Sequence, residues 1–330
     1  MFAKAAMHDD CLKLTTYFGE RDRANGGFLA DAFTEIYARH ELQTSLVLRG
    51  VEGFGHKHHL RTDRLLTLSE DLPIVSVAVD TRERIEAAHA EVQALEFDGL
   101  VTLERARMLT APIDRVELGE TTKLTVYVGR QERVEGRAAH LVVVDLLHDR
   151  GIAGATVLMG IDGTAHGVRE RARFFGRNAQ VPLMIIAVGE GPRIAAVLPE
   201  LTKLLPRPLI TLERVEVCKR DGRRLGEPHD LSGDDGVLQK LMVYAGGPVY
   251  QHLVAALREA GAAGATSLRG IWGYHGDHAP HGDRVLQARR RVPVLTVIVD
   301  TPQRARRWFE IADKLTAGTG LITSEIVPNR

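Results

Sequence analysis

The sequence predicts an α+β protein made of three copies of one domain in tandem. Three short apolar runs break into glycines in the same way, and their central glycines, Gly50, Gly160 and Gly270, are each 110 residues apart. A fixed period of this kind is the signature of a repeat architecture. The chain has 330 residues, so each copy has about the commonest domain size and is expected to bury a core of its own.

In the first copy, strand and helix signals follow one another in a definite order. Residues 13–17 alternate as in a strand, and apolar residues recur at helical spacing over 28–40. Thr81 suits the N-cap of a second helix. The other elements are expected as strands over 45–50, 74–79 and 99–109 and as a helix over 81–96. The order β-α-β-β-α-β is that of the ferredoxin-like fold.

The second and third copies repeat this order with one difference. In the second copy we expect strands over 123–128, 155–160, 183–188 and 209–218 and helices over 138–150 and 193–205. In the third copy, the interval from Gly246 to Gly270 is seven residues shorter than the interval from Gly19 to Gly50. The charged loop over 20–26 is therefore absent from it. We place the copies at 11–109, 121–218 and 238–327, and the linkers at 110–120 and 219–237.

The number of copies predicts how they assemble. A four-stranded sheet with helices on one face leaves its other face bare, and that face must pack against something. Copies joined by linkers are held at high effective concentration and readily pack together. The simplest closed arrangement is a pseudo-trimeric ring formed by a monomeric chain. The alternatives are a string of separate domains, or copies that serve a larger oligomer.

Composition and motifs limit the classes of function that we expect for the chain. Lys plus Arg equals Asp plus Glu, at 43 each, so a general nucleic-acid-binding role is not expected. Two cysteines favour a reducing compartment. Residues 1–14 lack the apolar segment of a signal peptide, and runs such as 183–188 are too short to cross a bilayer. We therefore expect a cytoplasmic protein. No nucleophile, metalloprotease or phosphate-loop motif is present in the sequence, which gives no reason to propose an enzyme.

Three stretches of the first copy carry a resemblance to a known family. They read GERDR over 19–23, LRGVEGFG over 48–55 and RLLTLSEDLP over 64–73. In order and spacing they resemble the bacterial PII-like family called domain of unknown function 190, and the other two copies resemble it more loosely. The resemblance implies a ferredoxin-like PII fold, normally built as a homotrimer, and a ligand-sensing role without catalysis. It also implies a protein partner, such as a membrane transporter or channel.

The same resemblance implies where a ligand would bind. PII proteins bind adenine nucleotides between subunits, with the phosphates against a glycine-rich turn whose N–H groups suit an anion. In the third copy, Gly318 and Gly320 lie in such a turn. The corresponding turns over 96–99 and 205–208 carry acidic residues or prolines. The alternative interpretation is an ordinary helix-to-strand turn in all three copies.

Arginines of the charged loops lie near helix starts, where free N–H groups favour anions. With the arginines of the last strands and the motif glycines, they make up the expected site for a small anion between copies. The expected ligand-binding residues are Arg21, Arg23, Arg49, Gly50, Gly53, Gly55, Arg105, Arg130, Arg133, Gly160, Arg214, Gly270, Gly318 and Gly320. The alternative is a cluster of surface ion pairs, which contribute little energy.

Histidines gather in the loops that follow the second strand of each copy. Those singled out are His56, His58, His59, His275, His278 and His281. Imidazoles are good ligands for zinc or copper, so the alternative function is divalent-metal binding, as in the cation-tolerance proteins of the wider PII-like superfamily. Solvated polar loops are the other interpretation. An enzyme with a cleft site between copies is a third class.

Overall fold

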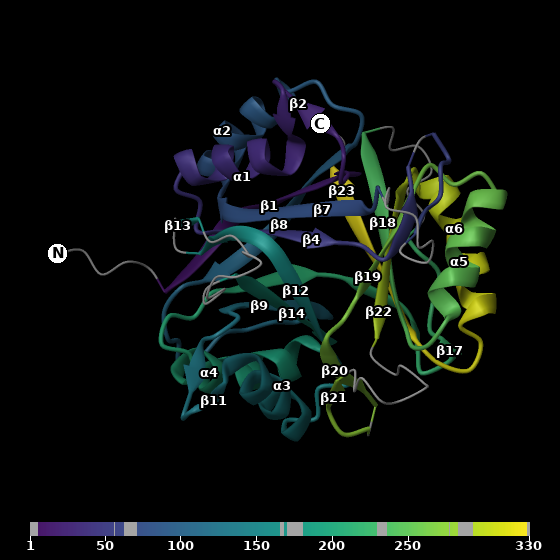
Figure 1. Ribbon diagram of the computed structural model, residues 1–330. Helices are drawn as coiled ribbons and strands as arrows, with labels where there is room; N and C mark the ends of the chain where they lie inside the picture. Colours follow the sequence, from purple (N-terminus) through teal and green to yellow (C-terminus); the bar gives the residue numbers. More distant parts are fainter. Residues whose placement is uncertain are drawn as a thin grey trace.

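The computed structural model describes residues 6–55, 57–62, 71–165, 168–169, 181–229, 236–276, 278–282 and 293–328. Three pairs of helices lie at the periphery, and the strands lie between them (Figure 1). The α+β class predicted from the sequence is confirmed. No helix within the described ranges is long and apolar enough to span a membrane.

The first repeat forms a four-stranded antiparallel sheet in the order β8-β1-β7-β4. In chain order its main elements are β1 (Met7–Gly19), α1 (Leu29–Arg39), β4 (Thr44–Arg49), β7 (Pro73–Thr81), α2 (Arg82–Gln93) and β8 (Leu100–Leu109). The helices predicted over 28–40 and 81–96 are therefore present, with slightly shorter bounds.

The second and third repeats have equivalent sheets, in the orders β15-β9-β14-β12 and β23-β18-β22-β19. The second repeat consists of β9 (Thr122–Gly129), α3 (Ala139–Asp149), β12 (Gly154–Ala165), β14 (Pro182–Gly189), α4 (Gly191–Leu204) and β15 (Ile210–Arg214). The third consists of β18 (Val237–Ala245), α5 (Val249–Glu259), β19 (Ala265–Arg269), β22 (Val294–Asp300), α6 (Pro302–Leu315) and β23 (Leu321–Pro328).

After its second strand, each repeat sends an arm to the sheet of another repeat. In the first repeat, β5 (Glu52–Phe54) pairs with β19. In the second, the end of β12 pairs with β4, and in the third, β20 (Trp272–His275) pairs with the start of β12. The arms of the first and third repeats turn back in β6 (Arg61–Thr62) and β21 (His281–Gly282), and β13 (Val168–Arg169) pairs with the end of β12. The pairings link the first repeat to the third, the second to the first and the third to the second.

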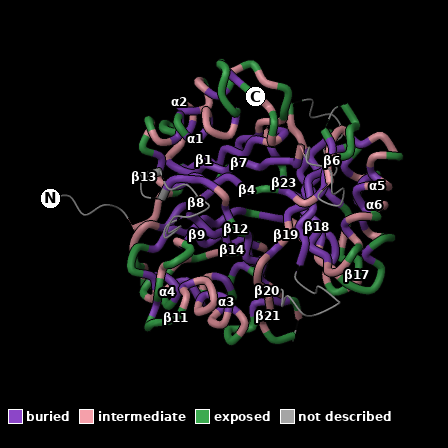
Figure 2. Tube along the Cα trace, in the orientation of Figure 1, coloured by how far each residue is buried: buried purple, intermediate pink, exposed green. Residues whose placement is uncertain are grey.

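Apolar residues form one core under each helix pair and a further core between the sheets. The central core draws on all three repeats, for example through Val77, Ile186 and Val297. Figure 2 shows this buried chain in the middle of the molecule, with exposed residues mainly at its rim. The face of each sheet that its own helices leave bare is therefore covered by the other repeats.

Both charged loops fold as short hairpins. Two-residue ladders join β2 (Arg23–Ala24) to β3 (Gly27–Phe28), and β10 (Arg133–Val134) to β11 (Arg137–Ala138). The turn residues Asn25 and Gly26 both have positive φ, as a type I′ turn requires. The linker expected over 219–237 also begins with structure, because β16 (Glu216–Arg220) pairs with β23 and turns into β17 (Arg223–Arg224).

Candidate functional site

A large open cleft lies between the second and third repeats, with a volume of about 2120 Å³. One wall is the start of β12, and another is the end of β18 with the loop that follows it. The third-repeat arm, from Trp272 to Gly282, and the turn Gly318–Gly320 complete the lining. The cleft therefore gathers the glycine turn and the third group of histidines that the sequence singled out.

The missing charged loop explains why space is open here. In the first repeat that loop is present, and the Asp22 carboxylate accepts a hydrogen bond from the Gly19 N–H at 2.6 Å. The Arg61 guanidinium from the arm lies directly over Gly19 and pairs with Asp71 at 3.0 Å. In the third repeat no such loop follows β18, and the arm position equivalent to Arg61 is His281.

The same deletion changes the partner of a motif arginine. Arg49 in the first repeat pairs with Glu20 of the charged loop at 2.9 Å. Its counterpart in the third repeat, Arg269, has no such loop beside it, lines the cleft and donates to the Tyr250 hydroxyl at 3.0 Å. The second repeat has Met159 at this position. Of the three repeats, only the third places a motif arginine in this cleft.

Among the described residues, the charged side chains that line the cleft have a positive balance. In that part of the chain the lining contains two arginines, Arg220 and Arg269, and one carboxylate, that of Asp221. Burial, together with the charges of His278 and His281, lowers the pKa of His275, so this imidazole is neutral at neutral pH. The cleft is therefore suited to an anion.

The glycine turn, Gly318–Gly320, forms one wall of the cleft. Gly320 has φ of +92°, a conformation that favours glycine, and its carbonyl accepts the Asp221 N–H at 3.0 Å. The β16–β17 hairpin packs closely against the turn, since a Cβ on Gly222 would lie 2.9 Å from the Gly318 carbonyl carbon. Gly318 and Gly320 therefore line the cleft, in a turn that contacts the β16–β17 hairpin.

The expected loop arginines do not meet at this cleft. The Arg23 guanidinium lies 4.8 Å from the centroid of the Phe28 ring, and Arg133 donates to the Gly136 carbonyl at 3.3 Å. Arg21 and Arg130 lie at the starts of their hairpins, away from the cleft lining. The arginines of the last strands, Arg105 and Arg214, are exposed and lie outside the lining.

Most of the motif glycines lie at junctions between strands. A Cβ on Gly53 would come within 2.5 Å of the Ala265 carbonyl oxygen in the third repeat, and one on Gly163 within 2.3 Å of the Ser45 oxygen in the first. A Cβ on Gly50 or Gly160 would meet the proline that opens the third strand, at 2.6 and 2.7 Å. Gly270 donates its N–H to the Pro293 carbonyl at 3.0 Å. These glycines allow close backbone contact. Gly55 differs, because it is exposed and a Cβ on it would have no atom of the described residues within 4 Å.

The six histidines do not form one cluster. His275, His278 and His281 line the cleft, and the His275 and His278 ring centroids are 5.0 Å apart. His58 stacks on Phe54 at a different junction, His59 is exposed, and His56 lies outside the described residues. Among described residues, the one group of three metal-ligand types with ligand atoms within 4.8 Å of one another is Glu104, Glu213 and Glu325. The cleft histidines are therefore more widely spaced than a compact metal site requires.

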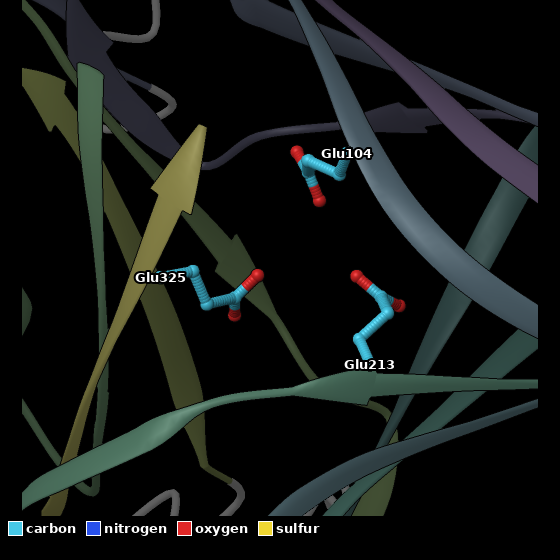
Figure 3. A group of neighbouring side chains, drawn as sticks. All are labelled: Glu104, Glu213 and Glu325. Carbon is cyan, nitrogen blue, oxygen red and sulfur yellow. The ribbon is translucent and has the colours of Figure 1, made fainter. Parts of the chain in front are cut away.

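The three glutamates belong to a feature that sequence reasoning missed. They come from β8, β15 and β23 and point toward one another at the centre of the molecule (Figure 3). Each glutamate carboxylate pairs with the ammonium groups of two lysines. Lys13 pairs with Glu104 and Glu213, Lys123 with Glu213 and Glu325, and Lys240 with Glu325 and Glu104. We call these six residues the charge ring.

The charge ring is closed, buried and balanced. Five of its pairs are 2.6–3.0 Å long, and the sixth joins Lys13 to Glu213. Burial raises the pKa of the Glu104 carboxyl, but the lysine charges outweigh it and hold that pKa well below its usual range. Because three ammonium groups already neutralise the carboxylates, this glutamate cluster is not a vacant cation site. A lysine at the same place in the apolar first strand of each copy was the available signal.

Comparison with known proteins places the repeats in a family. The family model DUF190, described as "Uncharacterized ACR", matches residues 11–108, 121–217 and 238–328. The "UPF0166 protein" of Aquifex aeolicus (strain VF5) is 34% identical over 85 residues, which cover 26% of this chain and 78% of that protein. A solved aspartate kinase from Synechocystis aligns with 98% of this chain but 52% of its own, at 11% identity and a TM-score of 0.26.

Proposed function

The chain belongs to the DUF190 family, whose domain it contains three times in tandem, and from this premise we propose that it is a non-catalytic sensor of a small anion. The anion would bind in the cleft between the second and third repeats, and the bound state would be passed to a protein partner. The family resemblance is the reason to consider a transporter or channel as that partner, and an adenine nucleotide as one candidate ligand.

We propose further that each repeat is a ferredoxin-like, PII-like unit and that the three form a pseudo-trimeric ring. The strand order of the three sheets supports this, because the first and third strands lie side by side at the centre and the second and fourth lie outside them. The arms support it as well, since each repeat sends one arm and receives one. The charge ring is cyclic as well, since the lysine of each repeat pairs with the glutamate of another repeat.

The observation that carries the anion proposal is the opening of one cleft by the loss of the charged loop. In the first repeat, Arg49 is engaged by Glu20 of that loop. In the third repeat, Arg269 lines a cleft that also contains Arg220 and the glycine turn. Guanidinium groups and backbone N–H groups are the donors that proteins use for carboxylates and phosphates. One anion site per chain follows from this difference.

A matched pair of substitutions tests the proposal. Arg269→Met installs the residue of the second repeat, and Arg49→Met makes the same change outside the cleft. Calorimetric titration with inorganic pyrophosphate and with ATP, at fixed salt because the attraction is screened, should give one site per chain. Arg269→Met should weaken binding by roughly 1.5–3 kcal/mol, as expected for a hydrogen bond to a charged group, and Arg49→Met should leave it unchanged. Absence of binding, three equal sites, or equal effects of both changes would contradict the proposal.

A further inference from the structure

One arm position differs in charge between the three repeats. The residue that precedes the second motif glycine is Glu52 in the first repeat, Asp162 in the second and Trp272 in the third. Both carboxylates are buried, with exposed fractions of 3% and 7%. Each of these residues begins or lies in the strand that pairs with the neighbouring repeat. The third repeat alone therefore lacks a buried negative charge at this junction.

Trp272 has features of a binding residue. Its side chain lines the cleft, and its buried Nε1–H has no hydrogen-bond partner among the described residues. A buried indole N–H normally finds an acceptor, because an unpaired donor costs free energy. An acceptor atom of a bound ligand would supply the missing partner.

The arm is shaped to hold this indole. Gly282 is the residue opposite Trp272 in the β20–β21 ladder, and a Cβ on it would lie 2.5 Å from the Trp272 Cε3. The first repeat has Thr62 opposite Glu52. The third arm thus has a glycine opposite a large ring, where the first arm has a threonine opposite a carboxylate. The absence of a Cβ at Gly282 lets the indole lie close to the returning strand.

We propose that Trp272 contacts the ligand and selects for negative charge in this cleft. This inference rests on the proposed anion-binding function and adds a residue to it. The Nε1 atom is covered in the unliganded chain, so the indole turns on binding and its Nε1–H donates to an oxygen of the ligand, while Arg269 and the glycine turn contact the ligand from other walls. Donors on several walls fit a polyanion with several acceptor oxygens, of the diphosphate class. A carboxylate in this cleft would repel such a ligand.

Two substitutions separate the donor from the charge. Trp272→Phe keeps an aromatic ring without the N–H, and Trp272→Glu introduces the residue of the first repeat. The matched control is Trp308→Phe, which alters a fully buried tryptophan bonded to Asp300 in the α6 core, outside the cleft. The probe is inorganic pyrophosphate, measured by calorimetry at fixed salt, with thermal unfolding to verify that each variant is folded.

Trp272→Phe should weaken pyrophosphate binding at least about tenfold, as for a lost hydrogen bond to a charged group. Trp272→Glu should weaken it further, by at least about a hundredfold, because a like charge is added. The control should bind as the wild type does. The chain has two tryptophans, so in Trp308→Phe the emission comes from Trp272 and should change on titration. This optical test does not depend on whether Trp272→Glu folds.

Different results would overturn different claims. If the wild type binds pyrophosphate at one site and both Trp272 variants bind it equally well, with no change in Trp272 emission, the role of Trp272 is wrong and the anion cleft stands. If the wild type binds neither pyrophosphate nor orthophosphate, the anion cleft and the role of Trp272 both fail.

Discussion

The charge ring shows how single residues decide the stability of a buried ionic network. Removing an ion from water costs several kcal/mol, and that cost is offset only when counter-ions and hydrogen bonds are well placed. Lys123 is fully buried and lies 2.6 Å from Glu325 and 3.0 Å from Glu213. Burial still lowers the pKa of its ammonium group against the attraction of these two carboxylates. The network is neutral as a whole, so deleting one member should be more harmful than deleting an oppositely charged pair.

We therefore expect Lys123→Met alone to lower the free energy of unfolding by about 3–5 kcal/mol, because a buried carboxylate loses its counter-ion. Adding Glu213→Met should restore much of this loss, since the remaining four charges are again balanced. Urea unfolding followed by circular dichroism measures both effects. The control is Lys57→Met, which breaks an exposed pair with Asp98 and should change stability little. A double variant as unstable as the sum of its single variants would show that the ring does not act as a unit.

At the scale of elements, the arms join the repeats. The motif glycines let the strands of two repeats approach each other closely enough to pair. Gly53 lies in β5 beside β19, and a Cβ there would approach the Ala265 carbonyl oxygen to 2.5 Å and the Pro73 ring to 3.1 Å. These atoms belong to backbone and a rigid ring, so neither can move aside cheaply. The spacing of the glycines in the sequence therefore reflects contact between repeats.

Gly53→Ala should destabilise the protein by roughly 1–3 kcal/mol, the usual cost of overpacking. Gly55→Ala is a close control, because it lies two residues further along the same arm and a Cβ there would have no atom of the described chain within 4 Å. Thermal and urea unfolding of the two variants provide the comparison. Equal stability of the two variants would mean that the arm adjusts without cost.

Local signals predicted most elements of the fold. Apolar spacing placed the first helix at 28–40 and it spans Leu29–Arg39, and the third strand expected over 74–79 spans Pro73–Thr81. The Asn25–Gly26 pair is a strong hairpin signal that the sequence reasoning left in an open loop. Residues within one copy thus contain enough information for its elements, because their periodicity and turn chemistry are local.

The candidate site was predicted less completely, because its residues meet across repeats. The glycine turn and the third-repeat histidines were named, but nothing local to them indicates that Arg220 and the start of β12 complete the cleft. The charge ring has the same difficulty, since Lys123 and its partner Glu325 are 202 residues apart. Aligning the three copies position by position would have exposed the repeated lysine, and also the exchange of Glu52 for Trp272.

At the scale of the whole molecule, the charge ring is a point where all three repeats meet, so its ionisation should affect how firmly they hold together. The lysine charges lower the pKa of Glu104 and Glu325 against the opposing effect of burial. The carboxylates of Glu104 and Glu325 therefore bind protons more readily in the unfolded chain than in the folded one. Their contribution to stability is complete above the unfolded pKa, about 4.3, and is lost as pH falls through the lower folded values.

Acid should consequently destabilise the wild type more than it destabilises a variant whose charge ring is replaced by apolar residues. We expect the free energy of unfolding of the wild type to begin to fall below about pH 5, where glutamates of the unfolded chain take up protons, and to go on falling as the pH passes through the lowered pKa values of the folded ring. A variant with methionine at all six ring positions lacks these groups and should lose less stability over the same range, with other carboxylates such as Asp10 acting equally in both proteins. Lys240 acts at the opposite end of the pH scale. The ring carboxylates raise its pKa against the opposing effect of burial, so its contribution to the free energy of unfolding persists through neutral pH and is lost only in strong alkali. Urea unfolding at pH 7, 5, 4 and 3 measures the difference in stability between the two proteins, and small-angle scattering at each pH reports whether the three repeats separate. Identical acid sensitivity in the two proteins would mean that the ring is not what couples the repeats to pH.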